Sequence, residues 1–245
     1  MDGAKPLNLR DSRAIDQARP QASQQLPMPA APQPTPHFTP LGSLKAENLH
    51  VWRGDRHVLK GVGLTAGAGE CLQVTGPNGT GKTTLLRTLA GLMYPEEGNV
   101  FWAGKDIRSD MHGFHADLGY IGHEPPLKPD LTPPENLKYW LGIRRIISKL
   151  EIDDALARVG ADYWRDRPVR TLSAGQKRRV ALAGLILMAV PLWLLDEPTT
   201  NLDTQGQGLV ATLIEEHLAR GGVVVAAIHH ELNVAAAGLR RLEIG

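Results

Sequence analysis

A glycine-rich loop constrains the fold of this chain more than any other feature. Residues 76–83 read Gly-Pro-Asn-Gly-Thr-Gly-Lys-Thr and match the pattern G-x-x-x-x-G-K-[ST]. The loop follows the short apolar run Glu70–Thr75, which is typical of a buried strand, and opens a helix predicted over Lys82–Leu92. Glycines let successive backbone N–H groups turn toward an anion, and the helix N-terminus adds partial positive charge. This arrangement predicts a nucleoside triphosphate site.

The residues of this loop have separate expected roles. Lys82 would reach the β- and γ-phosphates, and the hydroxyl of Thr83 would ligate Mg²⁺. The predicted ligands are therefore a nucleotide and Mg²⁺. The residues expected to contact the nucleotide in this segment are Gly76, Pro77, Asn78, Gly79, Thr80, Gly81, Lys82, Thr83 and Thr84.

A pair of carboxylates indicates where the metal and the attacking water would lie. Asp196 and Glu197 directly follow the apolar run Leu192–Leu195. A carboxylate at the end of a buried strand beside the phosphate loop suits Mg²⁺, usually through water, and the next carboxylate can polarise the attacking water. Asp196 is thus a predicted metal site together with Thr83, and Glu197 is a predicted catalytic residue.

Apolar runs elsewhere predict strands that alternate with helices. Leu192–Leu195 and Val223–Ile228 are continuous, as in strands covered on both faces of a parallel sheet. Further strands are predicted at Gly98–Trp102 and Leu118–Ile121; helices are predicted from Thr132, over Ile152–Val159 and Gln176–Ala189, and around Leu209–Ile214. The alternation predicts an α/β domain over residues 43–245 with an all-helical insertion at about 125–175.

Composition separates one segment from the rest and excludes several classes. Residues 1–42 hold eight of the 18 prolines, so we expect a disordered tail there. A net charge of +1 argues against a nucleic-acid binder, and the single Cys71 cannot form an internal disulfide. The longest uncharged apolar stretch, Val180–Leu195, contains Pro191 and is shorter than the ~20 residues of a membrane helix. No secretory signal is expected, and an enzyme of the cytoplasm is the default.

Three further motifs, taken with the phosphate loop, resemble the ATP-binding-cassette (ABC) ATPases. These are Leu172-Ser-Ala-Gly-Gln176, Asp196-Glu-Pro-Thr-Thr-Asn-Leu-Asp203 and His229. They follow the family's order for signature, Walker B with D-loop, and switch histidine, and Ala174 replaces one glycine of the usual signature. The resemblance implies a P-loop NTPase fold with a mostly parallel sheet, an antiparallel β part and an inserted helical subdomain, with ATP and Mg²⁺ as cofactors.

The resemblance also implies a mechanism that needs two copies of the cassette. Glu197 would be the general base, His229 would contact the γ-phosphate, and Asp203 would pass between subunits. The signature residues, which would address the nucleotide of the partner copy, are Leu172, Ser173, Ala174, Gly175 and Gln176. A Ser hydroxyl and amides at a helix N-terminus are good anion donors, so this expectation is physically sound.

The chain departs from the family pattern at two positions. No glutamine stands at the Q-loop, where either His123 or Glu124 would take its place, and we expect Glu124→Gln to alter ATPase rate or its Mg²⁺ dependence. The usual adenine-stacking aromatic aligns with Arg53, whose neighbour is Trp52. Both side chains can stack on a base, but adjacent strand residues face opposite ways, and we favour Arg53.

Within the family, the chain resembles the ATP-binding subunits of bacterial cytochrome c maturation, also called haem exporters. The segments that carry this resemblance are Gly122–Thr132, Glu135–Leu137 and Pro168–Gln176. It implies an integral membrane permease, a second copy of the ATPase and haem-handling maturation proteins as partners, with no nucleic acid. It places the chain as a peripheral protein on the cytoplasmic face of the bacterial inner membrane. Three histidines, His112, His115 and His123, could suggest haem contact, but they are expected in solvated loops.

Three alternatives remain at this stage. The first is the ATPase of another exporter with different cargo. The second is a soluble ABC ATPase acting on ribosomes or DNA; these usually carry two cassettes or a long coiled coil, whereas this chain has one phosphate loop and a short stretch from Thr83 to Leu172. The third is a cassette that only binds ATP, against which Lys82, Glu197 and His229 argue.

Overall fold

The computed structural model describes residues 42–229, 232–235 and 238–245. The tail predicted over residues 1–42 lies, apart from Gly42, outside the described residues. The elements are β1 (Leu44–Arg53), β2 (Arg56–Ala66), β3 (Cys71–Thr75), α1 (Lys82–Leu89), β4 (Glu97–Trp102), β5 (Lys105–Asp106), η1 (Ile107–Ser109), α2 (Met111–Ala116), β6 (Leu118–Ile121), α3 (Pro133–Leu141), α4 (Lys149–Arg158), η2 (Val169–Thr171), α5 (Ala174–Met188), β7 (Leu192–Asp196), α6 (Thr204–Ala219), β8 (Val223–Ala227) and β9 (Leu239–Glu243).

Five parallel strands form the central sheet, in the order β6-β7-β8-β3-β9. The apolar runs predicted as doubly covered strands are β7 and β8, and every residue in both is buried. Because successive side chains of a strand face opposite ways, the side chains of β7 and β8 belong alternately to two hydrophobic clusters, one on each face of the sheet. The predicted parallel α/β core is confirmed.

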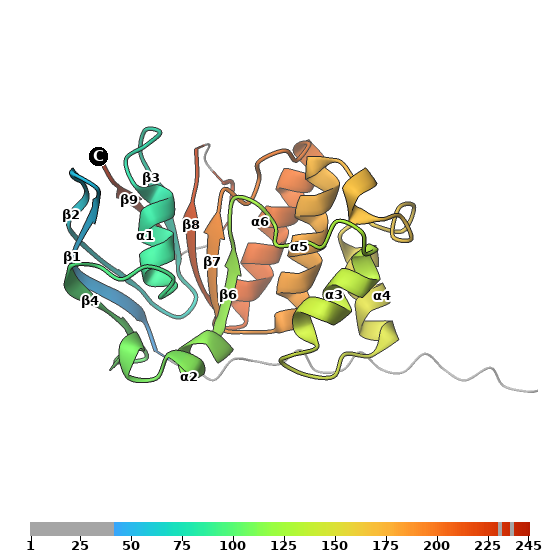
Figure 1. Ribbon diagram of the computed structural model, residues 1–245, viewed down its shortest axis with the longest axis horizontal. Coiled ribbons are helices and arrows are strands. Elements are labelled where there is room, and N and C mark those ends of the chain that lie inside the picture. Colours follow the sequence, from blue (N-terminus) through green and yellow to red (C-terminus); the bar gives the residue numbers. More distant parts are fainter. Residues whose placement is uncertain (1–41, 230–231, 236–237) are drawn as a thin grey trace, which may run out of the picture. The chain divides into compact units, whose positions relative to one another are not determined.

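Each face of the sheet has its own cover (Figure 1). One cluster joins Trp193, Leu195 and Val224 to apolar side chains of α3, α4, α5 and α6. The other joins Leu192, Leu194 and Val225 to α1 and to the antiparallel sheet of order β2-β1-β4-β5. The antiparallel β part expected from the family resemblance is therefore present, and it packs on the α1 side.

The segment 125–175, predicted to be a helical insertion, contains α3, α4 and η2. Helix α3 begins at the predicted cap, where the backbone N–H and hydroxyl of Thr132 both donate to the Glu135 carboxylate at 2.8 Å. Ser148 and Glu151 make the same kind of capping box at α4. These caps set where the helices start, and the Asn136 side chain ties α3 to the backbone of the preceding loop.

Several boundaries differ from the prediction. Helix α1 ends at Leu89, three residues before Leu92, because Gly91 adopts a left-handed φ of 70°. Helices α4 and α5 begin before their predicted starts, at the residues that follow their serine caps. In the part of the chain that the structure describes, no helix has the length and apolar character to cross a membrane.

Candidate active site

Four loops meet at one edge of the parallel sheet, and the candidate site lies there. Because β3, β6, β7 and β8 run in the same direction, their carboxyl ends share this edge. The residues that follow these strands are the phosphate loop after Thr75, His123 after β6, Glu197 after β7 and His229 after β8. The fold thus brings together segments far apart in the sequence, as the motifs required.

Glycine is required in the phosphate loop for steric reasons. Gly76 has a φ of 145°, and a Cβ there would lie 2.1 Å from the backbone oxygen of Ile244. Gly81 has a φ of 106° and caps α1, and a Cβ there would lie 2.7 Å from a methyl group of Val58. Any other residue would push the loop off the sheet edge, so these glycines keep the backbone amides close to the edge.

Lys82 and Thr83 take the positions expected of them at the start of α1. The buried ammonium of Lys82 donates to the backbone oxygens of Gly76 (2.6 Å) and Pro77 (3.1 Å), so it lies over the loop. The hydroxyl of Thr83 donates to Oδ1 of Asp196 at 3.2 Å. A hydroxyl and a carboxylate are therefore in contact across α1 and β7, as a shared metal site requires.

Asp196 has the chemistry of an oxygen ligand for Mg²⁺. Its side chain is 1% exposed, and its Oδ2 atom has no hydrogen-bond partner among the described residues. Burial raises the pKa of this carboxyl, while the bond from Thr83 lowers it. No cluster of three His, Cys, Asp or Glu side chains that could hold a metal occurs in the described ranges. The residues fit an ion held by Thr83, Asp196 and phosphate oxygens.

Glu197 is held in a strained conformation between two hydrogen-bond donors. Its φ of 50° is unusual for a residue with a side chain, and its N–H donates to the backbone oxygen of Ala227 at 2.9 Å. The carboxylate accepts a hydrogen bond from the Thr200 hydroxyl at 3.0 Å and pairs with His229 Nε2 at 2.6 Å. Burial alone would raise the pKa of Glu197, but these bonds and the nearby histidines outweigh it, and the pKa is lowered. These contacts favour the ionised carboxylate, which is the form that a general base needs.

The structure distinguishes the two Q-loop candidates. His123 Nδ1 lies 3.5 Å from Oε2 of Glu197, and the His123 side chain lines the same hollow as the phosphate loop. Glu124 is exposed and is not among the described residues that line this hollow. Geometry therefore brings His123, and not Glu124, to the site.

The hollow at the sheet edge encloses about 680 Å³. Arg53 lines it, whereas Trp52 stacks on His57 with ring centroids 3.8 Å apart. A further lining residue, Arg56, donates to the backbone oxygen of Gly79 at 2.7 Å. The other predicted residues in its lining are Asn78, Gly79, Gly81, Lys82, Thr83, Thr84, His123, Glu197 and His229, while Thr80 lines an adjoining hollow.

The signature stands apart from this hollow. Ser173 caps α5 in a capping box with Gln176, and a Cβ on Gly175 would lie 2.5 Å from the backbone oxygen of Asn201. Asp203 caps α6 and pairs with Arg179 at 3.1 Å. Among the described residues that line the hollow, none belongs to Leu172–Gln176. A single copy therefore presents half of the site implied by the family resemblance.

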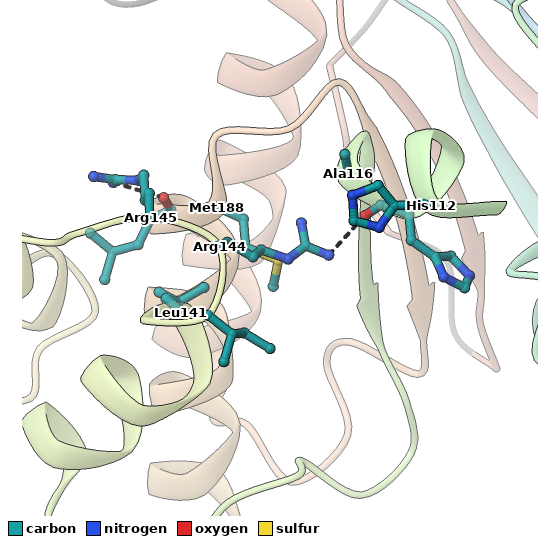
Figure 2. Close-up of a pocket in the computed structure, with 9 residues that line it drawn as sticks. His112, Ala116, Leu141, Arg144, Arg145 and Met188 are labelled. Carbon is teal, nitrogen blue, oxygen red and sulfur yellow. Dashed lines mark hydrogen bonds between the residues drawn. The ribbon is translucent and has the colours of Figure 1, made fainter. Parts of the chain in front are cut away.

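A second hollow, of about 510 Å³, lies between α2, the end of α3 and the end of α5. Figure 2 shows Arg144 reaching from the segment after α3 toward α2, where it donates to the backbone oxygen of His115 at 2.8 Å. The lining combines His112, His115 and two arginines with apolar side chains, and it includes no carboxylate among the residues described. The described lining contains neither a phosphate loop nor the carboxylate pair of the first hollow, and His112 and His115 lie in α2 and not in the solvated loop expected for them.

Sequence reasoning missed three residues of the site: Arg56, Thr200 and Arg178. Arg178 is 2% exposed and donates to the backbone oxygens of Gly122 and His123. The spacing of Thr200, three residues after Glu197, is a signal in the sequence, because a short hydroxyl side chain at that distance can bond back to the carboxylate. For the two arginines no signal existed beyond their charge.

Comparisons with known proteins agree with this geometry. The family model described as ABC transporter matches residues 59–200. Cytochrome c biogenesis ATP-binding export protein CcmA of Methylococcus capsulatus is 50% identical over 192 residues, which cover 78% of this chain and 93% of that protein. The protein of the same name from Escherichia coli K12 is 41% identical, covering 83% of this chain and 97% of the relative.

A solved structure supports the fold independently. An ATP-binding cassette, described as a dimer in a post-hydrolysis state bound to ADP and Pi, has a TM-score of 0.71 and 26% identity, covering 82% of this chain and 96% of the other. The resemblance inferred from the motifs is therefore confirmed, and so are the P-loop fold and ATP as the nucleotide. The chain belongs to the ABC transporter family of ATP-hydrolysing subunits, among the cytochrome c biogenesis ATP-binding export proteins.

Proposed function

We propose that this chain is the ATPase subunit of a haem exporter in cytochrome c maturation. ATP hydrolysis would drive transfer of haem, or release of a haem-loaded chaperone, on the far side of the membrane. The observation that carries the hydrolytic part is Glu197, held by Thr200 and His229 beside the phosphate loop. The names of relatives 41–50% identical support the export part.

The residues of the sheet edge would divide the reaction among them. Lys82 and the loop amides would hold the phosphates, and Arg53 would stack on adenine. Thr83 and Asp196 would hold Mg²⁺, which supplies charge neutralisation of the phosphates when bound. Glu197 would accept the proton of the attacking water at its carboxylate, and His229 would keep that carboxylate oriented.

The second half of the site would come from another copy of the chain. Ser173 and the backbone of Gly175 stand at the start of α5, where amides and a hydroxyl suit a γ-phosphate. Asp203 would lie at the same interface. The similar cassette solved as a dimer supports this arrangement, so we expect ATP to bring two copies together.

We place the contact with the permease at the face around the second hollow. Ile143 and Leu92 are exposed by 88% and 58%, and they line this hollow and the one beside it. The guanidinium of Arg144, which donates to the backbone oxygens of His115 and Leu118, and the exposed His112 favour an acidic group. The occupant would be a helical segment of the permease with an apolar face and a carboxylate, on the cytoplasmic side of the bacterial inner membrane.

An affinity capture would test this function. Glu197→Gln would be trapped with ATP and Mg²⁺ and captured from detergent-solubilised membranes of the native host, with Lys82→Ala as the control that cannot hold nucleotide. We expect a small permease together with haem-handling proteins and a haem absorption band. An unrelated permease without haem would refute the cargo, and ribosomes or nucleic acid without membrane protein would refute the transport role.

A further inference from the structure

Arg178 is a buried cation beside the candidate site, and the reaction proposed above assigns it no role. It lies in the second turn of α5, five residues after the cap Ser173, and its side chain is 2% exposed. A charge in such a place needs full compensation, because an unpaired buried ion costs several kcal/mol. Its compensation comes from backbone oxygens, so the arginine holds main chain and not another side chain.

The two oxygens belong to consecutive residues of the loop after β6. Nη1 donates to the Gly122 oxygen at 2.8 Å, and Nη2 donates to the His123 oxygen at 2.6 Å. A planar guanidinium presents these two donors in a fixed fork, so it fixes both the position and the direction of this short segment. Burial lowers the pKa of Arg178, and the nearby carboxylates of Asp196 and Glu197 offset part of this lowering.

The segment held in this way carries the imidazole that faces the proposed general base. His123 Nδ1 is 3.5 Å from Glu197 Oε2, and 59% of the His123 side chain is exposed, so packing does not fix it. Thr200 and His229 already hold the carboxylate from other sides. The orientation of His123 therefore depends on its backbone, which Arg178 holds by two hydrogen bonds.

We propose that Arg178 is a positioning residue that links the signature helix to the catalytic carboxylate through His123. Ser173, at the start of the same helix, is expected to meet the nucleotide of the partner copy. A shift of α5 on that contact would move Arg178, the two carbonyls and His123 together, and would place the imidazole against Glu197. The inference rests on the proposed role of Glu197 as general base.

A double-mutant cycle on the full chain would test this link. Turnover of MgATP and the Kd of a fluorescent ATP analogue would be measured for wild type, Arg178→Lys, His123→Ala and the double variant. A lysine keeps the buried charge but cannot span both oxygens. We expect kcat to fall roughly 10- to 100-fold in Arg178→Lys with the Kd within about twofold, since small misplacements of catalytic groups have effects of this size. In the His123→Ala background, the same change should lower kcat by less than about twofold.

Controls separate this link from general damage and from failure of the proposed function. Arg240→Met is the matched control. Arg240 lies in the edge strand β9, donates to the Thr65 oxygen and pairs with Glu70, so its loss should leave kcat unchanged. If Arg178→Lys melts below the assay temperature, Arg178→Gln takes its place in the cycle. An equal loss of kcat in both backgrounds, or a loss confined to ATP affinity, would overturn the proposal. Near-normal turnover in Glu197→Gln would instead overturn the role of Glu197, while the coupling between residues 178 and 123 would still be measured.

Discussion

His217 makes the folding stability of this chain depend on pH in a way that can be calculated. The ring is fully buried in α6, stacks on Trp193 with centroids 3.9 Å apart, and bonds the Pro191 oxygen through Nε2 at 3.1 Å. A Cβ on Gly222 would lie 2.2 Å from the ring, so the cavity fits the imidazole closely. Burial, and then the charge of Arg220, lower the pKa of His217 to about 3.

The sign of the effect follows from which state binds the proton. The unfolded chain takes up a proton on this histidine near pH 6.5, whereas the folded chain does so only near pH 3. The stabilisation is therefore complete above pH 6.5 and falls as the pH drops toward 3. Between pH 7.5 and 5.5 the loss from this one residue is about 1.4 kcal/mol, because one pKa unit corresponds to about 1.4 kcal/mol.

Urea unfolding of wild type and His217→Gln at both pH values would measure this loss. The glutamine stays neutral and can still donate to the Pro191 oxygen, so it lacks the titration and keeps the bond. Other groups titrate equally in both proteins. The change in unfolding free energy between the two pH values should be about 1.4 kcal/mol larger for wild type. Equal changes in the two proteins would refute the reasoning, since they would mean that folded His217 takes up protons normally.

Three predictions concern the nucleotide site. Arg53→Ala should weaken ATP binding by about 1–3 kcal/mol, the range of a stacking contact, while Trp52→Ala should not, as isothermal titration can show; the reverse order would exchange their roles. Changing the Q-loop by His123→Gln should alter the Mg²⁺ dependence of ATP turnover more than Glu124→Gln, and a larger effect at Glu124 would contradict the geometry. Gly175→Ala should abolish ATP-dependent dimers, because its Cβ would lie 2.5 Å from the Asn201 oxygen and would displace the signature segment that is expected to meet the partner's nucleotide. Sedimentation would compare it with Gly208→Ala, whose Cβ meets no atom within 4 Å, and dimers of both variants would refute the prediction.

The sequence predicts the central strands β7 and β8 well, because strands buried on both faces consist of an unbroken run of apolar residues. Leu192–Leu195 and Val223–Ile228 needed only their composition and length to be recognised. The antiparallel strand β1 lacks such a run, since register shifts between Ala46 and His50 break the alternation of buried and exposed residues. The edge strand β9 reads Leu-Arg-Arg-Leu-Glu; its two leucines are half-buried and its three charged residues are exposed, so the sequence shows no strand pattern there.

The residues of the candidate site also fall into two groups, those that motifs predict and those that only the structure locates. Residues with fixed spacing, such as those of the phosphate loop or Asp196 and Glu197, can be assigned from motifs because the chemistry constrains the chain locally. The choice between His123 and Glu124 could not be made from spacing, since both follow β6 and only the turn of the backbone decides which faces Glu197. Arg178 acts through main-chain oxygens 55 and 56 residues away, and no local pattern records such a contact.

Replacing Glu197 alone is the sharpest test of its role as the general base of a two-copy ATPase. The measurement is steady-state MgATP turnover of Glu197→Gln beside wild type, with ATP binding measured on the same samples. We expect kcat to fall roughly 10²- to 10⁴-fold with ATP binding retained, because a general base contributes a factor of this size. Turnover within a few-fold of wild type, with ATP bound, would contradict it.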